Sequence, residues 1–499
     1  MTQTPSVTSI PKRHIQQRQA IALLFTMAAL SITPIAAVAA IATDEQPKST
    51  INTATPTTER IREIDLWLSG QFKPEEPGAI VIISQNGKPL LKKTYGLSNL
   101  EKKTPLAFTD VMRIASMTKP FTAMAIMLLE EDGRLTVQDD ITRHLPGFAT
   151  NGNKITIANL LTHTSGLGVY SESPKLLEIL RDDTTSADII KFIQTLPSNS
   201  APGLVTHYNN SGYYILGSLI EKVSGMSYAD FMKKRVFMPL QLNRTALETA
   251  ADAPPLIPGY RVQNGRFSDA PKMTAVVGFS AGSIVSSADD IERWVVAVES
   301  RKLLKPATWQ RMMTNARLAN GTSTEYGYSW RLRKLRGQDI VEHGGNTVGF
   351  QSQMMLFPKE QLSFVVMTNQ QHRHNAARQV TERIAAMAIG RQFPDLKEVL
   401  LSDGVLDQLA GIYEAKDAPA RTITRVGKQL RLGSGNAQAT LHAYGENVFF
   451  QPDVSFTRYR FVKNAAGEVV EMIRIDASDE EKIFTKTAAG VQTTTAIKP

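Results

Sequence analysis

The chain has 499 residues, of which 42% are apolar and 21% charged, so it can bury the cores of two globular domains. It contains no cysteine, which excludes disulfide scaffolds, cysteine-ligated zinc and thiol catalysis. Lys and Arg number 56 against 47 Asp and Glu, but no basic run with interleaved aromatic residues occurs, so we expect no nucleic-acid partner.

The N-terminus is typical of an export signal. A basic stretch ending at Arg18 precedes an apolar run over residues 21–30 and a small-residue pattern at residues 37–39. We therefore predict a cleaved signal peptide over residues 1–39 and a periplasmic or secreted protein. An uncleaved membrane anchor is the alternative, because residues 21–42 are long enough to span a bilayer.

A linker rich in Thr, Ser, Ala and Pro is predicted over residues 40–56, followed by an amphipathic helix from Thr58. Asn86-Gly87 then joins two apolar runs, which is a strong hairpin signal. Helical patterns dominate between residues 116 and 300, and strand patterns return before a last helix. Residues 57–393 are thus predicted to form an α/β (α+β) domain, an antiparallel sheet flanked by helices with a helical lobe. The expected strands are 79–83, 90–95, 327–333, 340–343, 350–357 and 362–368, and the last helix is 375–389.

The C-terminal part has a different character. After a linker over residues 394–403, short alternating strands separated by turn residues predict a small antiparallel β domain over residues 404–499. Six strands are expected: 422–426, 429–432, 448–451, 459–462, 469–475 and 483–487.

Ser116 and Lys119 lie at the start of a predicted helix. Residues three apart share a helix face, with Cβ atoms about 5–6 Å apart, so the lysine amine can reach the serine hydroxyl. A buried lysine can lose its proton and activate a hydroxyl, and the helix start adds N–H groups that point at an incoming carbonyl. The pair therefore predicts a nucleophile and its base, although this short pattern alone also fits a capping serine beside a solvated lysine.

Two later segments carry suitable partners. Tyr208-Asn209-Asn210 offers a phenol for proton transfer and an amide for hydrogen bonding, although a plain turn explains it equally well in isolation. His343-Gly344-Gly345-Asn346 follows a predicted strand, and its glycines allow a substrate to approach the backbone closely. Backbone N–H groups there and at Ser116 can face the same carbonyl oxygen.

In this order and at these separations, the three segments resemble the motifs of the serine beta-lactamase and penicillin-binding family. The resemblance is to the branch that contains class C beta-lactamases, D-alanyl-D-alanine carboxypeptidases and related esterases. It spans about residues 57–390 and includes the segments Leu160–Leu167 and Ala281–Asp290. It implies the beta-lactamase/transpeptidase-like fold, and the C-terminal domain resembles, more weakly, the lipocalin-like β domain of extracytoplasmic members.

The resemblance also implies roles for single residues. The acylated serine falls on Ser116, and Lys119 and Tyr208 are the other catalytic residues. Class C beta-lactamases carry a lysine where this chain has His343, and a neutral imidazole binds a carboxylate less well, which argues against beta-lactam hydrolysis as the main activity. The implied substrate-binding residues are Asn210, His343, Gly344 and Gly345, and the implied oxyanion hole consists of the backbone N–H groups of Ser116 and Asn346.

The implied function is a serine hydrolase of carboxypeptidase, aminopeptidase or esterase type. Its substrate is expected to be a D-amino-acid peptide, a peptidoglycan stem or a small ester, with no cofactor and no metal. A penicillin-binding or peptidoglycan-sensing protein that is acylated without turnover is a second hypothesis. The sequence leaves open whether Lys119 or Tyr208 is the base, what the C-terminal domain does and which oligomer forms.

Two other patterns compete with this interpretation. Gly278-Phe279-Ser280-Ala281-Gly282 fits the nucleophile elbow of α/β-hydrolases, which makes an esterase using Ser280 a further alternative. That fold alternates strand and helix and places its oxyanion motif before the nucleophile, so Ser116 is the stronger candidate. His372 and His374 lack a third ligand at suitable spacing, so we expect a solvated loop rather than a metal site. His163 and His207 are expected to be structural histidines.

Overall fold

The computed structural model describes residues 56–489, except 182, 264, 372–375, 395, 417, 435–436 and 452–455. The predicted signal peptide, nearly all of the linker over 40–56 and the pair His372 and His374 lie outside these residues. The chain divides into two compact units, the first chiefly residues 65–332 and 341–372, the second chiefly residues 333–340 and the chain from 373 onward. Within the described part, no helix is both long and apolar enough to cross a bilayer.

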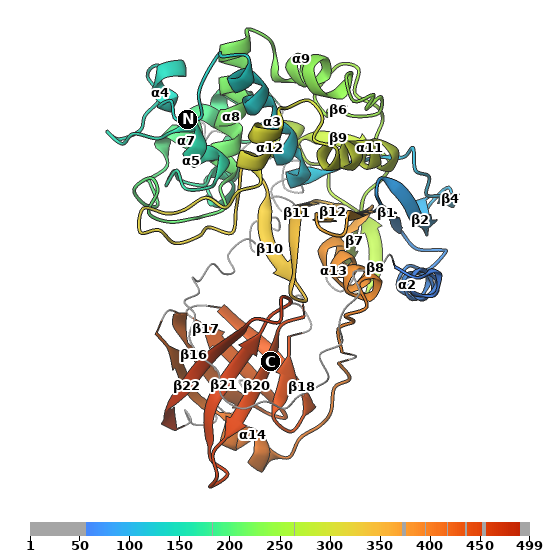
Figure 1. Ribbon diagram of the computed structural model, residues 1–499, viewed down its shortest axis with the longest axis vertical. Helices are drawn as coiled ribbons and strands as arrows, with labels where there is room; N and C mark the ends of the chain where they lie inside the picture. Colours follow the sequence, from blue (N-terminus) through green and yellow to red (C-terminus); the bar gives the residue numbers. More distant parts are fainter. Residues whose placement is uncertain are drawn as a thin grey trace, which may run out of the picture. The chain divides into compact units, whose positions relative to one another are not determined.

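Most of a six-stranded sheet belongs to the first unit, and its strand order is β10-β11-β12-β13-β1-β2 (Figure 1). The predicted hairpin is its β1-β2 edge, where Asn86 and Gly87 have φ values of 52° and 71°, as a two-residue hairpin turn requires. Every residue of β13 is buried, as expected of a central strand. The strands are β1 (Ala79–Gln85), β2 (Lys88–Tyr95), β10 (Arg331–Leu335), β11 (Gln338–Thr347), β12 (Phe350–Phe357) and β13 (Leu362–Thr368).

Helix α3 (Thr118–Glu131) forms the core of the helical lobe. Its first twelve residues are all buried, so it is enclosed on every side rather than amphipathic. It packs against α8 (Asn210–Ser224), which ends at Gly225 in the left-handed conformation. The other α-helices between residues 141 and 312 are α4 (Ile141–His144), α5 (Ile157–Leu161), α6 (Leu176–Ile179), α7 (Ser186–Thr195), α9 (Tyr228–Met232), α10 (Phe279–Gly282), α11 (Ala288–Glu299) and α12 (Pro306–Met312).

Shorter elements complete the structure around these layers. Helix α2 (Thr58–Gln71) begins where the sequence predicts, and α13 spans Ala377–Ala388. Single helical turns are η1 (Ala115–Met117), η2 (Tyr170–Glu172), η3 (Lys233–Phe237) and η4 (Ala275–Val277). The short strands are β3 (Leu97–Asn99), β4 (Thr104–Pro105), β5 (Val111–Arg113), β6 (Ala246–Leu247), β7 (Tyr260–Gln263), β8 (Arg266–Asp269), β9 (Ile284–Ser287) and β14 (Gln370–Gln371).

The fold class is confirmed, but one strand of the first unit begins later than predicted. The strand expected over 327–333 is β10, which starts at Arg331. Residues before it form a tight turn, in which Gly327 N–H donates to the Trp330 carbonyl at 2.8 Å and Ser329 has a φ of 75°. An apolar run with aromatic residues therefore marks a buried turn here rather than a strand.

The second unit contains a closed antiparallel barrel of eight strands. Two of them, β15 and β18, were not predicted, because one is short and the other lacks the alternation of large apolar residues that signals a strand. Helix α14 (Asp403–Leu409) closes one end, since Leu406 and Leu409 belong to the apolar core of the barrel. The strands are β15 (Gly411–Ala415), β16 (Ala418–Val426), β17 (Gln429–Ser434), β18 (Ala437–Gly445), β19 (Val448–Phe450), β20 (Arg458–Lys463), β21 (Val469–Ile475) and β22 (Glu481–Ala489).

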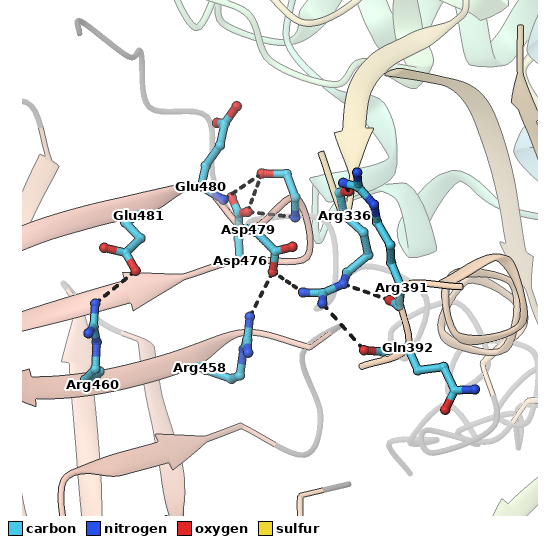
Figure 2. Close-up of polar contacts among 10 residues, drawn as sticks. Arg336, Arg391, Gln392, Arg458, Arg460, Asp476, Asp479, Glu480 and Glu481 are labelled. Atoms are coloured by element: carbon cyan, nitrogen blue, oxygen red, sulfur yellow. Dashed lines mark hydrogen bonds and ion pairs between the residues drawn. The ribbon is translucent and has the colours of Figure 1, made fainter. Parts of the chain in front are cut away.

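Within the second unit, the turn between β10 and β11 is bonded to the loop between β21 and β22 (Figure 2). The backbone N–H groups of Arg336 and Gly337 donate to the carbonyls of Ala477 and Ser478 at 2.9 and 3.0 Å. Asp479 accepts from the guanidinium of Arg336 and, at 3.0 Å, from that of Arg458. Backbone hydrogen bonds and ion pairs thus hold the β10-β11 turn against the β21-β22 loop.

Candidate active site

Ser116 lies in the single turn η1, between strand β5 and helix α3. The residue before it, Ala115, has a φ of 48°, an uncommon conformation for a residue with a Cβ atom. The Ile114 carbonyl holds the turn in place, because it accepts from Met117 N at 3.1 Å and from Ser352 Oγ at 2.9 Å. The surrounding structure therefore enforces a strained backbone directly before the candidate nucleophile.

Gly344 and Gly345 let strand β11 approach the turn η1 that carries Ser116. A Cβ atom at Gly345 would lie 2.0 Å from the Ile114 carbonyl oxygen, and one at Gly344 would lie 2.1 Å from Gln353 Oε1. Gly345 therefore cannot be replaced without moving the backbone at Ile114, whereas a larger residue at Gly344 would have to displace the Gln353 side chain. Asn346, which follows Gly345, is exposed. The segments that carry the two predicted oxyanion-hole N–H groups therefore adjoin.

Lys119 is completely buried in the first turn of α3. Its Nζ lies 3.1 Å from Ser116 Oγ, 2.8 Å from Asn210 Oδ1 and 2.9 Å from the carbonyl oxygen of Ala281 at the end of α10. The two carbonyl-type oxygens can only accept, and a neutral amine has two hydrogens and one lone pair. A neutral Lys119 therefore satisfies both oxygens and directs its lone pair at the Ser116 hydroxyl.

The environment favours that neutral form. Burial lowers the pKa of Lys119 well below its usual value, and the positive charge of Arg331 lowers it further. None of the described carboxylates pairs with the amine. Desolvation and like-charge repulsion act in the same direction, so both favour a neutral amine at Lys119.

The second motif completes the surroundings of the lysine. Asn210 begins helix α8, and its Nδ2 donates to Ser171 Oγ at 2.9 Å, which orients the amide oxygen toward Lys119. Tyr208 hydrogen-bonds to Ser116, and the Lys119 Nζ lies 4.7 Å from the centre of the tyrosine ring. Burial raises the pKa of Tyr208 to about 12, so the phenol keeps its proton at neutral pH.

His343 is buried, with 1% of its surface exposed, and both ring nitrogens have protein partners. Nδ1 lies 2.8 Å from the Gly344 carbonyl, which can only accept, so Nδ1 carries the proton. Nε2 therefore accepts from the Tyr326 hydroxyl at 3.1 Å. Burial lowers the pKa of His343 to about 3, with the positive charge of Arg331 adding to the effect, and the ring is neutral.

The structure adds residues that the motifs do not contain. Arg331 lies at the start of β10 with its guanidinium 5.6 Å from the Tyr208 ring centre, and no described residue hydrogen-bonds or ion-pairs with it. Ser171, Tyr326 and the Ala281 carbonyl hold Asn210, His343 and Lys119, respectively. No spacing rule points to these groups, because each comes from a segment distant in sequence.

The histidines outside the motif behave as structural groups. His163 is buried and accepts from the backbone N–H of Asn209 through Nδ1 at 3.0 Å, which supports the residue before Asn210. His207 Nε2 lies 3.3 Å from the carboxylate of Glu172. Among the described residues, no three His, Asp or Glu side chains lie close enough together to hold a metal ion.

Ser280 does not form a nucleophile elbow. It is completely buried, and its hydroxyl donates to the Tyr213 carbonyl at 2.9 Å. It packs on α8, where a Cβ atom at Gly217 would lie 2.1 Å from its Oγ. A substrate carbonyl has no access to this hydroxyl, and the α/β-hydrolase alternative is wrong.

Comparisons with known proteins show what this chain is similar to. The family model described as Beta-lactamase matches residues 68–388. Penicillin-binding protein 4* of Bacillus subtilis (strain 168) is 27% identical over 440 residues, which cover 81% of this chain and 94% of that protein.

Two solved structures share the fold. The octameric penicillin-binding protein homologue from Pyrococcus abyssi aligns with a TM-score of 0.61 and 20% identity, covering 86% of this chain and 98% of that one. D-amino acid amidase from Ochrobactrum anthropi SV3, complexed with L-phenylalanine amide, aligns with a TM-score of 0.57 and 22% identity, covering 65% of this chain and 98% of that one. The resemblance stated from the motifs is thereby confirmed.

Proposed function

Because the chain belongs to the Beta-lactamase family, we propose that it is an exported serine hydrolase that cleaves an ester or amide carbonyl through an acyl-enzyme on Ser116. One observation carries the proposal. The buried amine of Lys119 lies 3.1 Å from Ser116 Oγ, and its other two contacts are oxygens that can only accept. This arrangement turns an ordinary hydroxyl into a nucleophile.

Lys119 is the base in this mechanism. Its lone pair accepts the Ser116 proton as Oγ forms a bond to the substrate carbonyl carbon. The resulting ammonium donates hydrogen bonds to the oxygens of Asn210 and Ala281 until the proton is transferred onward. Tyr208 is not the base, because a pKa of about 12 keeps its phenol protonated. The phenol instead donates to the leaving group as the tetrahedral intermediate collapses, and it recovers a proton from Lys119.

The developing oxyanion is stabilised by backbone N–H groups. Those of Ser116 and Asn346 belong to segments held together at Ile114 and Gly345, so the donors need little reorganisation during the reaction. Water then attacks the acyl-enzyme, with Lys119 again accepting a proton.

Arg331 narrows the substrate class. His343 is neutral and its nitrogens already have partners, so it offers little to an anion. Arg331 is a permanent cation beside Tyr208 and lacks an ion-pair partner among the described residues. A substrate carboxylate can form an ion pair with Arg331, which favours D-amino-acid peptides or peptidoglycan stems with a free C-terminal carboxylate. The name of the D-amino acid amidase supports a substrate that contains a D-amino acid.

The test combines a mass measurement with turnover. The wild-type protein, S116A and S280A are incubated with acyl-D-alanyl-D-alanine and with a p-nitrophenyl ester. We expect turnover in the wild type and in folded S280A, and loss of about 10⁴-fold or more in S116A. Intact mass after brief exposure to a penicillin or an activated ester should show a transient adduct on Ser116. A permanent adduct without turnover would instead identify a sensor, and turnover retained by S116A would refute the proposal.

A further inference from the structure

His163 contacts both neighbours of Tyr208 as well as Tyr208 itself. The His163 carbonyl accepts from the backbone N–H of His207 at 2.9 Å, and its Nδ1 accepts from the backbone N–H of Asn209 at 3.0 Å. The imidazole ring also lies against the Tyr208 ring, with the two ring centres 4.4 Å apart. One residue therefore fixes the chain on each side of the tyrosine and packs on the tyrosine ring.

These contacts determine the protonation of the imidazole. Because Nδ1 accepts a hydrogen bond, the proton of the neutral ring is on Nε2. His163 is 2% exposed, and burial lowers its pKa well below the usual value, with the positive charge of Arg331 adding to the effect. A protonated ring would carry hydrogen on both nitrogens and could not accept from Asn209. The neutral form therefore keeps the contact with Asn209 at neutral pH.

A histidine is an unusual residue at this position. Helix α5 ends at Leu161, and His163, two residues later, has a φ of 59°. Left-handed residues after a helix are usually glycine and sometimes asparagine. In addition, the buried Nε2–H of His163 has no hydrogen-bond partner among the described residues, which costs free energy. A residue needed only to end the helix would avoid both costs, so the imidazole has a role of its own.

Asn209 has little freedom to compensate for a lost partner. Its side chain accepts from the backbone N–H of Gly212 at 3.1 Å and donates to the Leu167 carbonyl at 2.7 Å. Asn209 is 2% exposed, so removal of the His163 Nδ1 would leave its backbone N–H buried without this acceptor. The backbone would have to shift to find another, and Tyr208, the preceding residue, would move with it.

We propose that His163 is a positioning residue that holds Tyr208 in place for proton donation to the leaving group. It acts through Tyr208 rather than on the reacting atoms, and it keeps the phenol in its hydrogen bond with Ser116. The inference rests on the proposed function, in which Tyr208 protonates the leaving group. A phenol displaced by a fraction of an ångström transfers its proton more slowly.

The test compares two substrates whose leaving groups differ in their need for a proton. His163→Phe keeps an aromatic ring beside Tyr208 but removes the acceptor for Asn209. We expect kcat on acyl-D-alanyl-D-alanine to fall about tenfold or more, with KM nearly unchanged. The loss on a p-nitrophenyl ester should be much smaller, because p-nitrophenolate leaves without protonation. Equal losses on both substrates would overturn the inference, since a general structural defect predicts them.

His163→Asn is the conservative variant. Asparagine tolerates the left-handed conformation, and its Oδ1 can replace Nδ1 as the acceptor, so we expect it to recover most of the peptide turnover. His163→Leu is a second variant without an acceptor, for use if His163→Phe fails to fold, and the same pattern is expected of it. Failure of His163→Asn to recover peptide turnover would overturn the inference.

His207→Gln is the matched control. It changes a histidine of the same segment whose side chain is 39% exposed, and it keeps the backbone N–H that donates to His163. We expect turnover within about twofold of the wild type on both substrates. A loss as large as that of His163→Phe would overturn the inference.

Two further measurements separate this inference from the proposed function. In a Tyr208→Phe background, His163→Phe should cause little further loss on the peptide, because the proton donor is already absent, and a full additional loss would overturn the inference. Amide hydrogen exchange at Asn209 needs no turnover, and it should be faster in His163→Phe but not in His163→Asn. Unchanged exchange in His163→Phe would overturn the inference. Turnover retained by S116A would refute the proposed function, and exchange would still show whether His163 holds the segment.

Discussion

Lys119 and Arg421 are both basic residues that face the interior of their own unit, and burial lowers the pKa of each, with a neighbouring arginine adding to the effect. The consequences differ because the two groups differ in chemistry. A lysine amine can give up its proton when burial disfavours the charge, whereas a guanidinium stays charged under all ordinary conditions. The same physical effect therefore favours a neutral amine in the first unit and leaves a charged guanidinium in the second.

This contrast concerns which group can give up its proton. In the first unit, two acceptor oxygens complete the lysine and leave its lone pair for Ser116. In the barrel, Arg421 keeps its charge, because a guanidinium does not give up its proton. Each prediction below concerns one residue of the active site and the activity or stability that depends on its charge or proton.

The largest effect is expected from Lys119→Arg. Arginine can still donate to Asn210 and Ala281, but it has no lone pair at any accessible pH, so it cannot take the Ser116 proton. We expect kcat/KM to fall about 10³-fold or more, which is the scale of losing a general base. Steady-state kinetics with a p-nitrophenyl ester would measure it, with circular dichroism as the folding control. A variant that keeps a tenth of the activity would show that the lysine lone pair is not the base.

The second effect concerns Tyr208, whose phenol stays protonated because burial raises its pKa to about 12. Tyr208→Phe removes the proton donor, which matters for a poor leaving group such as an amine and little for p-nitrophenolate. We expect a loss of about 10²-fold or more on acyl-D-alanyl-D-alanine, with a much smaller loss on the p-nitrophenyl ester. Equal losses on both substrates would assign Tyr208 to positioning rather than to proton donation.

A smaller and more selective effect is expected from Arg331→Gln. Loss of a charge-assisted contact should lower kcat/KM about 10- to 100-fold on a peptide with a free C-terminal carboxylate. The same peptide with a C-terminal amide should lose far less, and this substrate pair is the control.

The same variant should change the pH profile. Arg331 lowers the pKa of Lys119, so its removal raises that pKa. Because the neutral amine is the active form, activity should then appear only at higher pH, on both peptides. An unchanged acidic limb would contradict the electrostatic coupling between Arg331 and Lys119.

The sequence predicted the parts of the site that depend on local geometry. Ser116 and Lys119 are one helical turn apart, so their 3.1 Å contact follows from spacing. Asn86-Gly87 specified a hairpin for the same reason. Arg331 could not be found in this way, because its neighbours come from other segments and only the register of β10 brings it beside Tyr208. Strands β15 and β18 were missed since closure of the barrel, rather than local alternation, determines them.

The resemblance predicted which residues gather but not what each atom does. It placed His343 among the substrate-binding residues, and in the structure the ring nitrogens contact Gly344 and Tyr326 instead. Tautomer and protonation depend on burial and on nearby charges, which a motif does not record. The motifs also leave open whether Lys119 or Tyr208 is the base. Burial lowers the pKa of Lys119 and raises that of Tyr208, which favours Lys119 in our proposal.

The smallest effect concerns His343, another basic group of the first unit that burial leaves uncharged. Its pKa of about 3 lies far below the usual value of 6.5, so between these pH values the unfolded chain binds a proton that the folded chain does not. Stability therefore rises with pH across this window, and it falls on acidification toward pH 3. Nitrogen NMR of the imidazole should show a neutral ring protonated at Nδ1, with no titration between pH 5 and 8. A ring that titrates near pH 6.5 would mean that His343 carries charge in the working enzyme, and the role of anion receptor would return from Arg331 to His343.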